Sequence, residues 1–400
     1  MSLSHFIEKI IEIQDSTITK IEEIGDTKHI YVTHNVKEHV CPSCGARTKR
    51  VHDYREQAIR GLPAYGFKVV YHLRKRRYTC TECNKRFYEQ TPYLTRYSRN
   101  TQRYDIKILD ELRALRTYTD IAKEYGCSVS TVIRKFDIVS YPKPKLPVTV
   151  SIDEFKGNAG GEKYNCIVAN PLKHEVIDIL PKRHYVYLLD YFKKYPYEQR
   201  KNVNIFVSDM WTPFQNMAEV MMPNAMRVVD KYHWTRQITW AFERVRKDVQ
   251  KHISPSYRRY FKRSRTLLLK SYESLDRTDQ QAVNVMLYAS ADISTAHFYK
   301  EEFQKIMKSK TRAEAKRKMN EWIDSAIECG VKPIEDAAKS LAHWKKEILD
   351  SFTTSCTNGF IEGCNNKIKV LKRISYGCKN FERFRNRILH IFSNKSETYA

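Results

Sequence analysis

Two Cys-x-x-Cys pairs near the N-terminus place the strongest constraint on the fold of this chain. They are Cys41-Pro-Ser-Cys44 and Cys80-Thr-Glu-Cys83, and together they offer four thiolates, the closed tetrahedral set that a structural Zn²⁺ prefers. The 35 residues between the pairs exceed the usual spacing, but they contain alternating segments such as FKVVYHL, which predict hairpin strands. We therefore predict a zinc ribbon holding one zinc ion. The alternative is four unconnected structural cysteines.

The net charge of the chain indicates a polyanionic partner. Its 400 residues carry 71 Lys and Arg against 46 Asp and Glu, a net charge of +25, and such a balance points most often to nucleic acid. A membrane surface is the other interpretation, but no stretch approaches the roughly 18 consecutive apolar residues of a spanning helix.

The N-terminal stretch MSLSHFIEKIIEIQDS is acidic and amphipathic and lacks the features of a secretion signal. With ten cysteines, this favours a reducing, cytoplasmic compartment.

Basic residues crowd both cysteine pairs. A run of charge is often only a solvated surface, but beside a zinc knuckle we favour contacts to phosphates. The residues assigned to DNA on this basis are Lys49, Arg50, Arg74, Arg76 and Arg77.

The segment TDIAKEYGCSVSTVIRKFD predicts a helix-turn-helix. Gly126 ends a short helix, and Ser128 is the expected N-cap of a second helix. The second helix has an apolar stripe at i, i+3, i+4 and i+7, namely Val129, Val132, Ile133 and Phe136. Its exposed face would enter the major groove of DNA. That face comprises Ser130, Thr131, Arg134 and Lys135. A plain helical hairpin is the alternative.

After the proline-rich segment YPKPKLP, the pattern changes to short β-branched runs and then to strand–helix alternation, which predicts a mixed sheet with helices on its faces. Between about 235 and 350 the pattern is charged and helical. The predicted multidomain α+β architecture comprises an N-terminal segment with the zinc ribbon (1–95), a helix-turn-helix (96–141), a linker (142–147), the first part of a mixed α/β core (148–235), a helical insertion (236–350) and the second part of the core with a basic tail (351–400).

Three carboxylates form a candidate metal site. Asp153 and Asp209 each follow an apolar strand pattern, where ligands gather in mixed α/β folds. Glu362 is predicted on a helix whose same face carries Asn366, Lys369 and Arg373. Two aspartates and a glutamate are a minimal ligand set for Mg²⁺ ions that assist an in-line displacement at phosphorus. The spacing alone leaves open that these acids are ordinary caps or turn residues.

Two further acids compete for these roles. Glu154 is next to Asp153 but falls on the opposite face of the strand, so only one of the two is expected to point into the site. Asp230 also ends a predicted strand. We interpret it as a strand-end cap with His233 behind the site rather than as a direct metal ligand.

The whole layout resembles the transposases of bacterial insertion sequences in the ISL-three family. The resemblance covers nearly the full chain, and its most specific part is the tail Asn358-Gly-Phe-Ile-Glu-Gly-Cys-Asn-Asn-Lys-Ile-Lys. The other matching motifs are the two cysteine pairs, Ile152-Asp-Glu-Phe155, Val207-Ser-Asp-Met-Trp211, Asp230-Lys-Tyr-His233, Lys372-Arg-x-x-Tyr-Gly377 and Asn380-Phe381. One position departs from the common pattern, since Tyr232 stands where phenylalanine is usual.

The resemblance implies an RNase H-like catalytic domain with a DDE triad, formed here by Asp153, Asp209 and Glu362. It implies two Mg²⁺ (or Mn²⁺) ions in the active site, cleavage and joining of DNA at the terminal inverted repeats of the element, and a homo-oligomer on DNA in the bacterial cytoplasm, at the nucleoid. The DNA-binding residues expected on the Glu362 helix are Asn366, Lys367, Lys369, Lys372 and Arg373.

Two other functions fit parts of the sequence. A zinc-ribbon and helix-turn-helix regulator without catalysis would account for the first 140 residues but leaves the acids unused. An RNase H-like nuclease that cuts without joining would use the acids in the same way.

Overall fold

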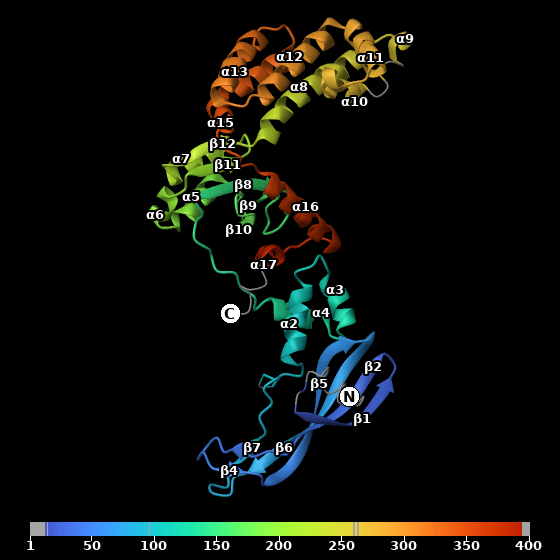
Figure 1. Cartoon of the computed structure of the whole chain (residues 1–400), viewed down its shortest axis with the longest axis vertical. Helices are drawn as coiled ribbons and strands as arrows, with labels where there is room; N and C mark the ends of the chain where they lie inside the picture. The colour runs from blue at the N-terminus through green and yellow to red at the C-terminus, as the bar shows by residue number, and fades with distance from the viewer. Residues whose placement is uncertain (1–12, 14, 96, 259–260, 262–263, 394–400) are drawn as a thin grey trace. The chain divides into compact units, whose positions relative to one another are not determined.

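A computed structural model describes residue 13 and residues 15–95, 97–258, 261 and 264–393 (Figure 1). The acidic N-terminal stretch, interpreted above as no secretion signal, lies almost wholly outside the described residues. The chain forms two compact units. The first comprises the described residues of Met1–Tyr141, Val370–Gly377 and Glu382–Asn394, and the second comprises those of Pro142–Lys369 and Cys378–Phe381. Among the described helices, none is long and apolar enough to cross a membrane.

A five-stranded sheet dominates the N-terminal part of the first unit. Its order is β1-β2-β6-β5, with β7 added to β6, and β3 pairs separately with β4. The long β5–β6 hairpin fills the space between the cysteine pairs, as predicted. The β1–β2 hairpin was not predicted. The strands are β1 Ser16–Ile24, β2 Thr27–His34, β3 His39–Val40, β4 Arg47–Thr48, β5 Val51–Ala64, β6 Phe67–Thr79 and β7 Arg86–Tyr88.

Three short helices follow, and they form the predicted helix-turn-helix. They are α2 Gln102–Glu111, α3 Tyr118–Glu124 and α4 Val129–Phe136. Gly126 lies between α3 and α4 with a φ of +62°, a left-handed conformation that glycine adopts without a steric cost. The Ser128 hydroxyl accepts the backbone N–H of Thr131 at 3.2 Å and so caps α4, as predicted.

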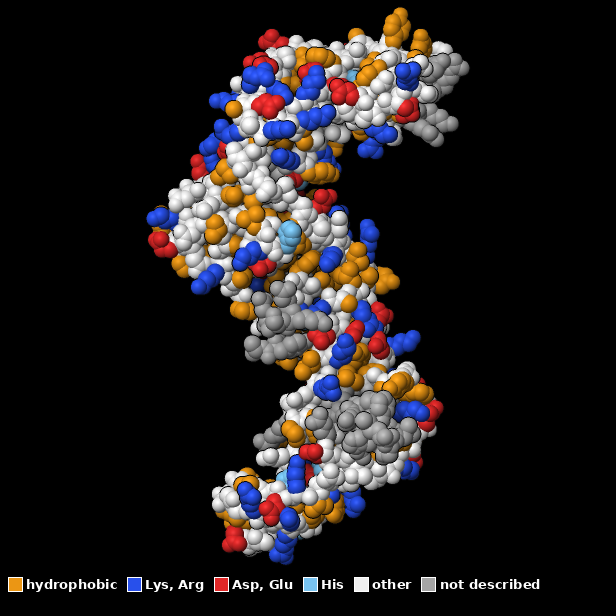
Figure 2. Space-filling view, in the orientation of Figure 1, with side chains coloured by type: hydrophobic (Ala, Val, Ile, Leu, Met, Phe, Trp, Pro, Cys, Tyr) orange, Lys and Arg blue, Asp and Glu red, His pale blue; other side chains and the backbone are white. Residues whose placement is uncertain are grey.

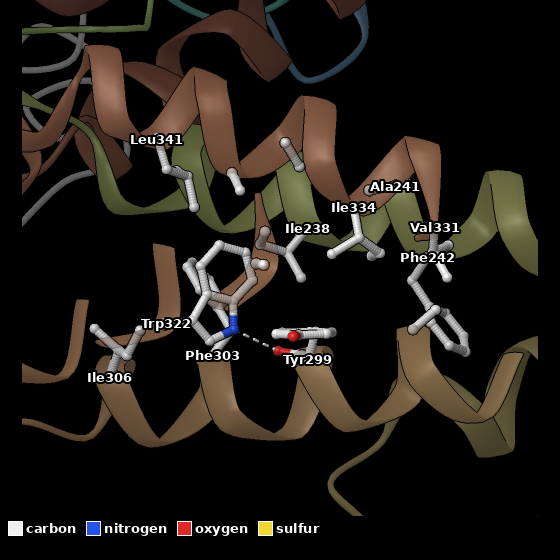
Figure 3. Packing of buried hydrophobic residues seen from close by; sticks show 14 of the residues in the cluster. Ile238, Ala241, Phe242, Tyr299, Phe303, Ile306, Trp322, Val331, Ile334 and Leu341 are labelled. Carbon is white, nitrogen blue, oxygen red and sulfur yellow. Dashed lines mark hydrogen bonds between the residues drawn. The ribbon is translucent and has the colours of Figure 1, made fainter. Parts of the chain in front are cut away.

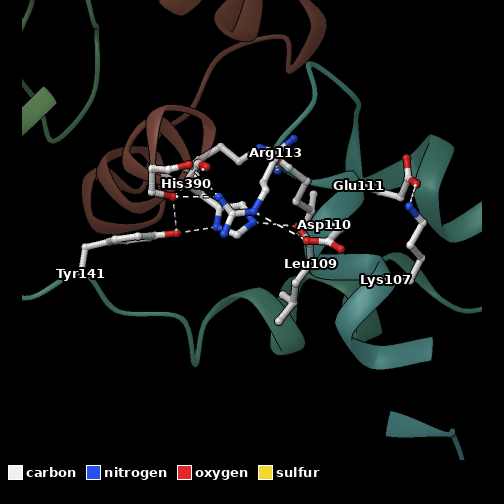
Figure 4. Close-up of polar contacts among 10 residues, drawn as sticks. Lys107, Leu109, Asp110, Glu111, Arg113, Tyr141 and His390 are labelled. Atoms are coloured by element: carbon white, nitrogen blue, oxygen red, sulfur yellow. Dashed lines mark hydrogen bonds and ion pairs between the residues drawn. The ribbon is translucent and has the colours of Figure 1, made fainter. Parts of the chain in front are cut away.

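The C-terminal helix α17 (Phe381–Phe392) completes this helical cluster. The guanidinium group of Arg387 is buried and donates to the carbonyl oxygens of Leu112, Ala114 and Arg116, beyond the end of α2. The buried His390 ring contacts the Leu109 carbonyl oxygen at 2.7 Å and the Tyr141 hydroxyl on its other side (Figure 4). The sequence prediction had assigned this segment to the catalytic core.

The second unit is built on a mixed five-stranded sheet of order β10-β9-β8-β11-β12. The first three strands are antiparallel neighbours, while β8, β11 and β12 run parallel. This is the strand order of an RNase H-like fold, which confirms the prediction. The strands are β8 Thr149–Phe155, β9 Asn165–Asn170, β10 Glu175–Leu180, β11 Ile205–Ser208 and β12 Met226–Val229; the helices beside them are α5 Tyr185–Lys193, α6 Tyr197–Lys201 and α7 Thr212–Met221.

The predicted helical insertion follows β12 and has its own hydrophobic core. Ile238, Tyr299, Trp322 and Leu341 meet inside it from four helices, and the Trp322 indole donates to the Tyr299 carbonyl oxygen at 2.9 Å (Figure 3). The described helices are α8 Lys231–His252, α9 Pro255–Arg258, α10 Ser264–Leu269, η2 Tyr272–Ser274, α11 Arg277–Tyr288, α12 Ala291–Met307, α13 Arg312–Ala326, α14 Lys332–His343 and α15 Lys345–Asp350. The chain then continues into α16 (Gly359–Ile374), which carries Glu362.

Candidate active site and DNA-binding surfaces

Parallel pairing brings three aspartates to the same edge of the central sheet. Val207 of β11 lies opposite Ser151 of β8, so Asp209 and Asp153, each two residues further along, leave neighbouring strands at the same level. Ser208 lies opposite Val229 of β12, and the next residues are Asp209 and Asp230. The carboxyl ends of parallel strands are where α/β folds bind ligands. The strands therefore gather these acids at one site.

Burial and mutual repulsion act strongly on two of these carboxyl groups. Burial, together with the negative charge of Asp209, raises the pKa of Asp153 to about 7. Burial, together with the charge of Glu154, raises the pKa of Asp209 to about 7. Glu154 is itself paired with Arg183. A cation between Asp153 and Asp209 would favour their ionised forms, because an opposite charge lowers a carboxyl pKa.

The helix α16 contacts this site through an asparagine that sequence analysis missed. The Asn365 side chain is buried, and its amide nitrogen donates to Asp153 Oδ2 at 2.9 Å. Asn365 is three residues after Glu362, so it lies one helical turn along α16. The Asn-Asn pair of the tail motif was the sequence signal that could have identified Asn365. The sequence analysis placed only Asn366 on the face of the helix that carries Glu362. Asn366 is exposed, in agreement with that placement.

Glu362 itself lies on the exposed side of α16, whose opposite face, with Ile361, Cys364, Ile368 and Leu371, is buried as predicted. The carboxylate contributes to the electrostatic environment of His233, whose pKa is lowered by burial. Among the described residues, the only group of three or more Cys, His, Asp or Glu side chains with ligand atoms all within 4.8 Å of one another is the four cysteines. Glu362, Asp153 and Asp209 therefore do not form a group as compact as the four cysteines.

Asp230 connects two segments that border the site. Its carboxylate accepts the backbone N–H of Tyr232 at 3.2 Å, capping α8, and the N–H of Asn358 at 3.0 Å, just before α16. Both carboxylate oxygens thus accept backbone N–H groups. One of these groups lies where the chain enters the helical insertion, and the other lies after the chain has left it.

The residues of the acidic site fit a divalent metal ion. Asp209 Oδ1 and Asn365 Oδ1 are buried, and neither has a hydrogen-bond partner within the described part of the chain. A buried oxygen without a partner is costly, and Mg²⁺ takes oxygen ligands of this kind.

The four cysteines form the predicted zinc site. The Sγ atoms of Cys41 and Cys83 lie 3.6 Å apart, those of Cys44 and Cys80 lie 3.5 Å apart, and all four lie within 4.8 Å of one another. These separations suit a tetrahedral ion with bonds of about 2.3 Å.

Elemental analysis of the full-length protein should find about one zinc per chain, because four thiolates complete the coordination shell. Cys80→Ser should lose this zinc and destabilise the β5–β6 hairpin, since metal binding is coupled to folding. Cys329→Ser, which changes a partly buried cysteine outside the cluster, is the matched control. A wild-type chain without zinc, or full retention in Cys80→Ser, would refute the assignment.

Part of the surface that α4 was predicted to present to DNA is exposed. Ser130 and Arg134 of α4 are exposed and Thr131 is half-buried. Lys135 departs from the prediction, because it is half-buried and pairs with Asp105 of α2 at 2.6 Å. Val129 also departs from its expected place in the apolar stripe, since it is exposed.

Of the basic residues near the cysteines, Arg76 is wrongly predicted to contact DNA. Its side chain is buried, and its guanidinium donates to the His34 carbonyl oxygen at 2.8 Å and lies 3.5 Å from the Glu89 carboxylate. Binding a phosphate would break this network. Arg77 is half-buried and paired with Asp53, while Lys49, Arg50 and Arg74 are exposed.

Arg134→Ala should weaken binding to the specific DNA site more than binding to unrelated DNA if the side chain contacts a base. Lys135→Ala should change both little, because Lys135 is paired with Asp105. Titrations at several salt concentrations check this, since a lost phosphate contact would weaken all sequences alike and reduce the salt dependence. Unchanged binding of Arg134→Ala would mean that α4 does not face DNA.

On α16, the residues predicted to bind DNA are mostly accessible. Asn366, Lys367, Lys369 and Arg373 are exposed, and Lys372 is half-buried. On the face shown in Figure 2, lysine and arginine side chains are spread over both units rather than gathered in one patch.

Family models match three successive parts of the chain. The zinc finger of the transposases IS204/IS1001/IS1096/IS1165 matches residues 37–83, and the helix-turn-helix domain of transposase family ISL3 matches residues 89–137. The transposase model of the same family matches residues 150–388. The transposase for insertion sequence element IS1001 of Bordetella parapertussis is 27% identical over 374 residues, which cover 91% of each chain.

A zinc ribbon, a helix-turn-helix and an RNase H-like domain with acids at its strand ends, in this order, define a DNA transposase. The family model covers more than half of the sequence. The chain belongs to the transposase family ISL3.

Proposed function

We propose that this transposase cuts and joins DNA at the terminal inverted repeats of its insertion sequence, with Asp153, Asp209 and Glu362 as the catalytic acids. The observation that carries the proposal is the pair of buried aspartates at neighbouring strand ends, with Asp209 Oδ1 lacking a partner among the described residues. Glu362, which is exposed on α16, would complete the set when DNA and metal are bound.

The three acids are proposed to hold two Mg²⁺ or Mn²⁺ ions. When bound, these ions supply Lewis-acid stabilisation of the attacking and leaving oxygens. Asn365 holds the Asp153 carboxylate by its hydrogen bond, and Asp230 fixes the start of α16. His233 is proposed to lie behind the site and to contact the substrate in neither of the two chemical steps of the reaction.

The proposed reaction has two in-line displacements at phosphorus. In the first, a water oxygen attacks the phosphorus at the element end, and the bond to the 3′-oxygen breaks, which leaves a free 3′-hydroxyl. In the second, this hydroxyl loses its proton and attacks a phosphorus of target DNA, and the target 3′-oxygen leaves. No external oxidant or energy source is required.

We assign DNA binding to accessible polar residues of both units. Lys49, Arg50, Arg74 and Arg77 would contact phosphates beside the zinc site, and the α4 surface would contact the terminal repeat. On α16, the exposed cations would hold the backbone near the acids. The proposed divisions of the chain remain those given above, except that residues 382–393 pack with the helix-turn-helix.

An insertion sequence has two ends, and we propose that the chain acts as a homo-oligomer on DNA that holds both. Its substrates are then both double-stranded: the terminal repeats and the target. Such a reaction on genomic DNA would take place at the nucleoid in the bacterial cytoplasm.

A strand-transfer assay tests this function against its rivals. The substrate is a labelled duplex that carries the inverted repeat flanking the gene, mixed with target DNA and Mg²⁺. Cutting followed by joining supports the transposase reaction, whereas cutting alone would indicate a nuclease. Binding without cutting would indicate a regulator. Omission of the divalent cation should abolish both chemical steps.

A further inference from the structure

The first turns of α8 carry a row of alternating aromatic and cationic side chains, in which both rings are exposed and Arg236 is half-buried. Tyr232 is 53% exposed and Trp240 is 46% exposed. Arg236 lies between them, with its guanidinium carbon 5.5 Å from the Tyr232 ring centroid and 4.2 Å from that of Trp240. The spacing of i, i+4 and i+8 places all three on one side of the helix. The row continues at Arg244, which is exposed.

This row is not needed for the core of the insertion. The buried face of α8 contributes Trp234, Ile238, Ala241 and Phe242 to that core. Isolated exposed apolar residues are common on proteins. Two large rings that flank an arginine are a more specific arrangement, because aromatic rings stack on bases and arginine binds phosphates or ring faces.

The row begins at the acidic site. The backbone N–H of Tyr232 is bonded to Asp230, and the Tyr232 and His233 rings lie 5.6 Å apart. The charges of Arg236 and Glu362 both act on His233. The aromatic row of α8 and the cationic surface of α16 therefore both adjoin the proposed reaction centre.

A base within an intact duplex has both faces covered by its neighbours. A base at a strand end, or one taken out of the helix, has a free face that can stack on a protein ring. We infer that the Tyr232–Arg236–Trp240 row binds bases of a DNA strand that is unpaired beside the scissile phosphate, while the α16 cations hold its backbone. This inference rests on the proposed function and adds that the element end is locally opened.

The test compares two duplexes with the full-length protein: a fully paired element end, and the same end with mismatched bases at the cleavage position. Trp240→Ala should cut the paired duplex about tenfold more slowly or worse, because base–aromatic stacking is lost. On the mismatched duplex the loss should largely disappear, since the strand is already open. Trp240→Phe should retain most of the activity, and Tyr232→Ala should behave like Trp240→Ala.

A direct readout uses 2-aminopurine at the unpaired position. Its fluorescence should fall on binding to the Asp209→Asn protein, which is expected not to cut. It should remain high on binding to the double variant that carries both Asp209→Asn and Trp240→Ala. Tyr288→Ala is the matched control, because Tyr288 is 87% exposed on α11 and should leave cutting and fluorescence unchanged. Equal losses on both duplexes, or normal cutting of the paired one by Trp240→Ala, would overturn the inference. A wild-type protein that cuts neither duplex would overturn the proposed function, and this inference with it.

Discussion

Asp209→Asn should abolish cleavage and joining while binding to the element end stays close to that of the wild type. The substitution preserves the size of the side chain but removes a negative charge at a site proposed to hold divalent cations. Losing several kcal/mol of charge stabilisation, at about 1.4 kcal/mol per factor of ten, lowers the rate by roughly 1,000-fold or more. Cleavage assays in Mg²⁺ and filter binding on the same preparations measure the two effects. Asp153→Asn and Glu362→Gln should behave alike.

Asp230→Asn is the matched control for these variants. Asp230 uses its two oxygens to accept two backbone N–H groups, and an asparagine can accept only one in that orientation. The expected loss is about 1–3 kcal/mol of stability and a smaller fall in activity than any of the three acids gives. If Asp209→Asn retained cleavage activity and Asp230→Asn lost it, Asp230 would be the second catalytic aspartate. Normal cutting by all four variants would refute the catalytic assignment.

Arg387→Ala should unfold the helix-turn-helix cluster and abolish specific DNA binding. The substitution removes a buried guanidinium and leaves the carbonyl oxygens of Leu112, Ala114 and Arg116 without this donor. Hydrogen bonds to charged groups contribute about 1.5–3 kcal/mol each, so the loss should reach about 3 kcal/mol or more. Thermal melts and DNA titrations are the measurements.

Arg383→Ala is the control on the same helix. Arg383 forms its ion pair with Asp137 at the surface, at 2.7 Å, and surface pairs contribute about 0–1 kcal/mol. The variant should therefore melt and bind almost like the wild type. If Arg387→Ala also melts and binds normally, α17 does not support the DNA-binding helices.

Features that depend on residues close together in the sequence could be predicted, whereas features that depend on contacts between distant residues could not. Hairpin strands, the Ser128 cap and the amphipathic helices depend on near neighbours, so periodicity and capping residues were sufficient to predict them. The position of α17 depends on contacts between residues more than 240 apart, such as Arg383 with Asp137. Its own pattern shows only a basic amphipathic helix and does not identify its partner.

The same distinction applies to the site. Asp153 and Asp209 could be proposed because each follows a strand, and parallel pairing then brings them together. Asn365 was missed because its role is set by a 2.9 Å contact with a residue 212 positions away. The burial of Arg76 was equally hidden, since a basic run looks the same whether its members face water or Glu89.

The place of α17 in the first unit also has a consequence for protein synthesis. A ribosome makes this helix more than 240 residues after its partner helices α2 and α4. The DNA-reading cluster is thus complete only after α17 has been synthesised. We expect a gene copy interrupted by a stop codon anywhere before residue 381 to yield a product that cannot occupy the element ends. Decaying copies in a genome would then not compete with an intact one for its DNA.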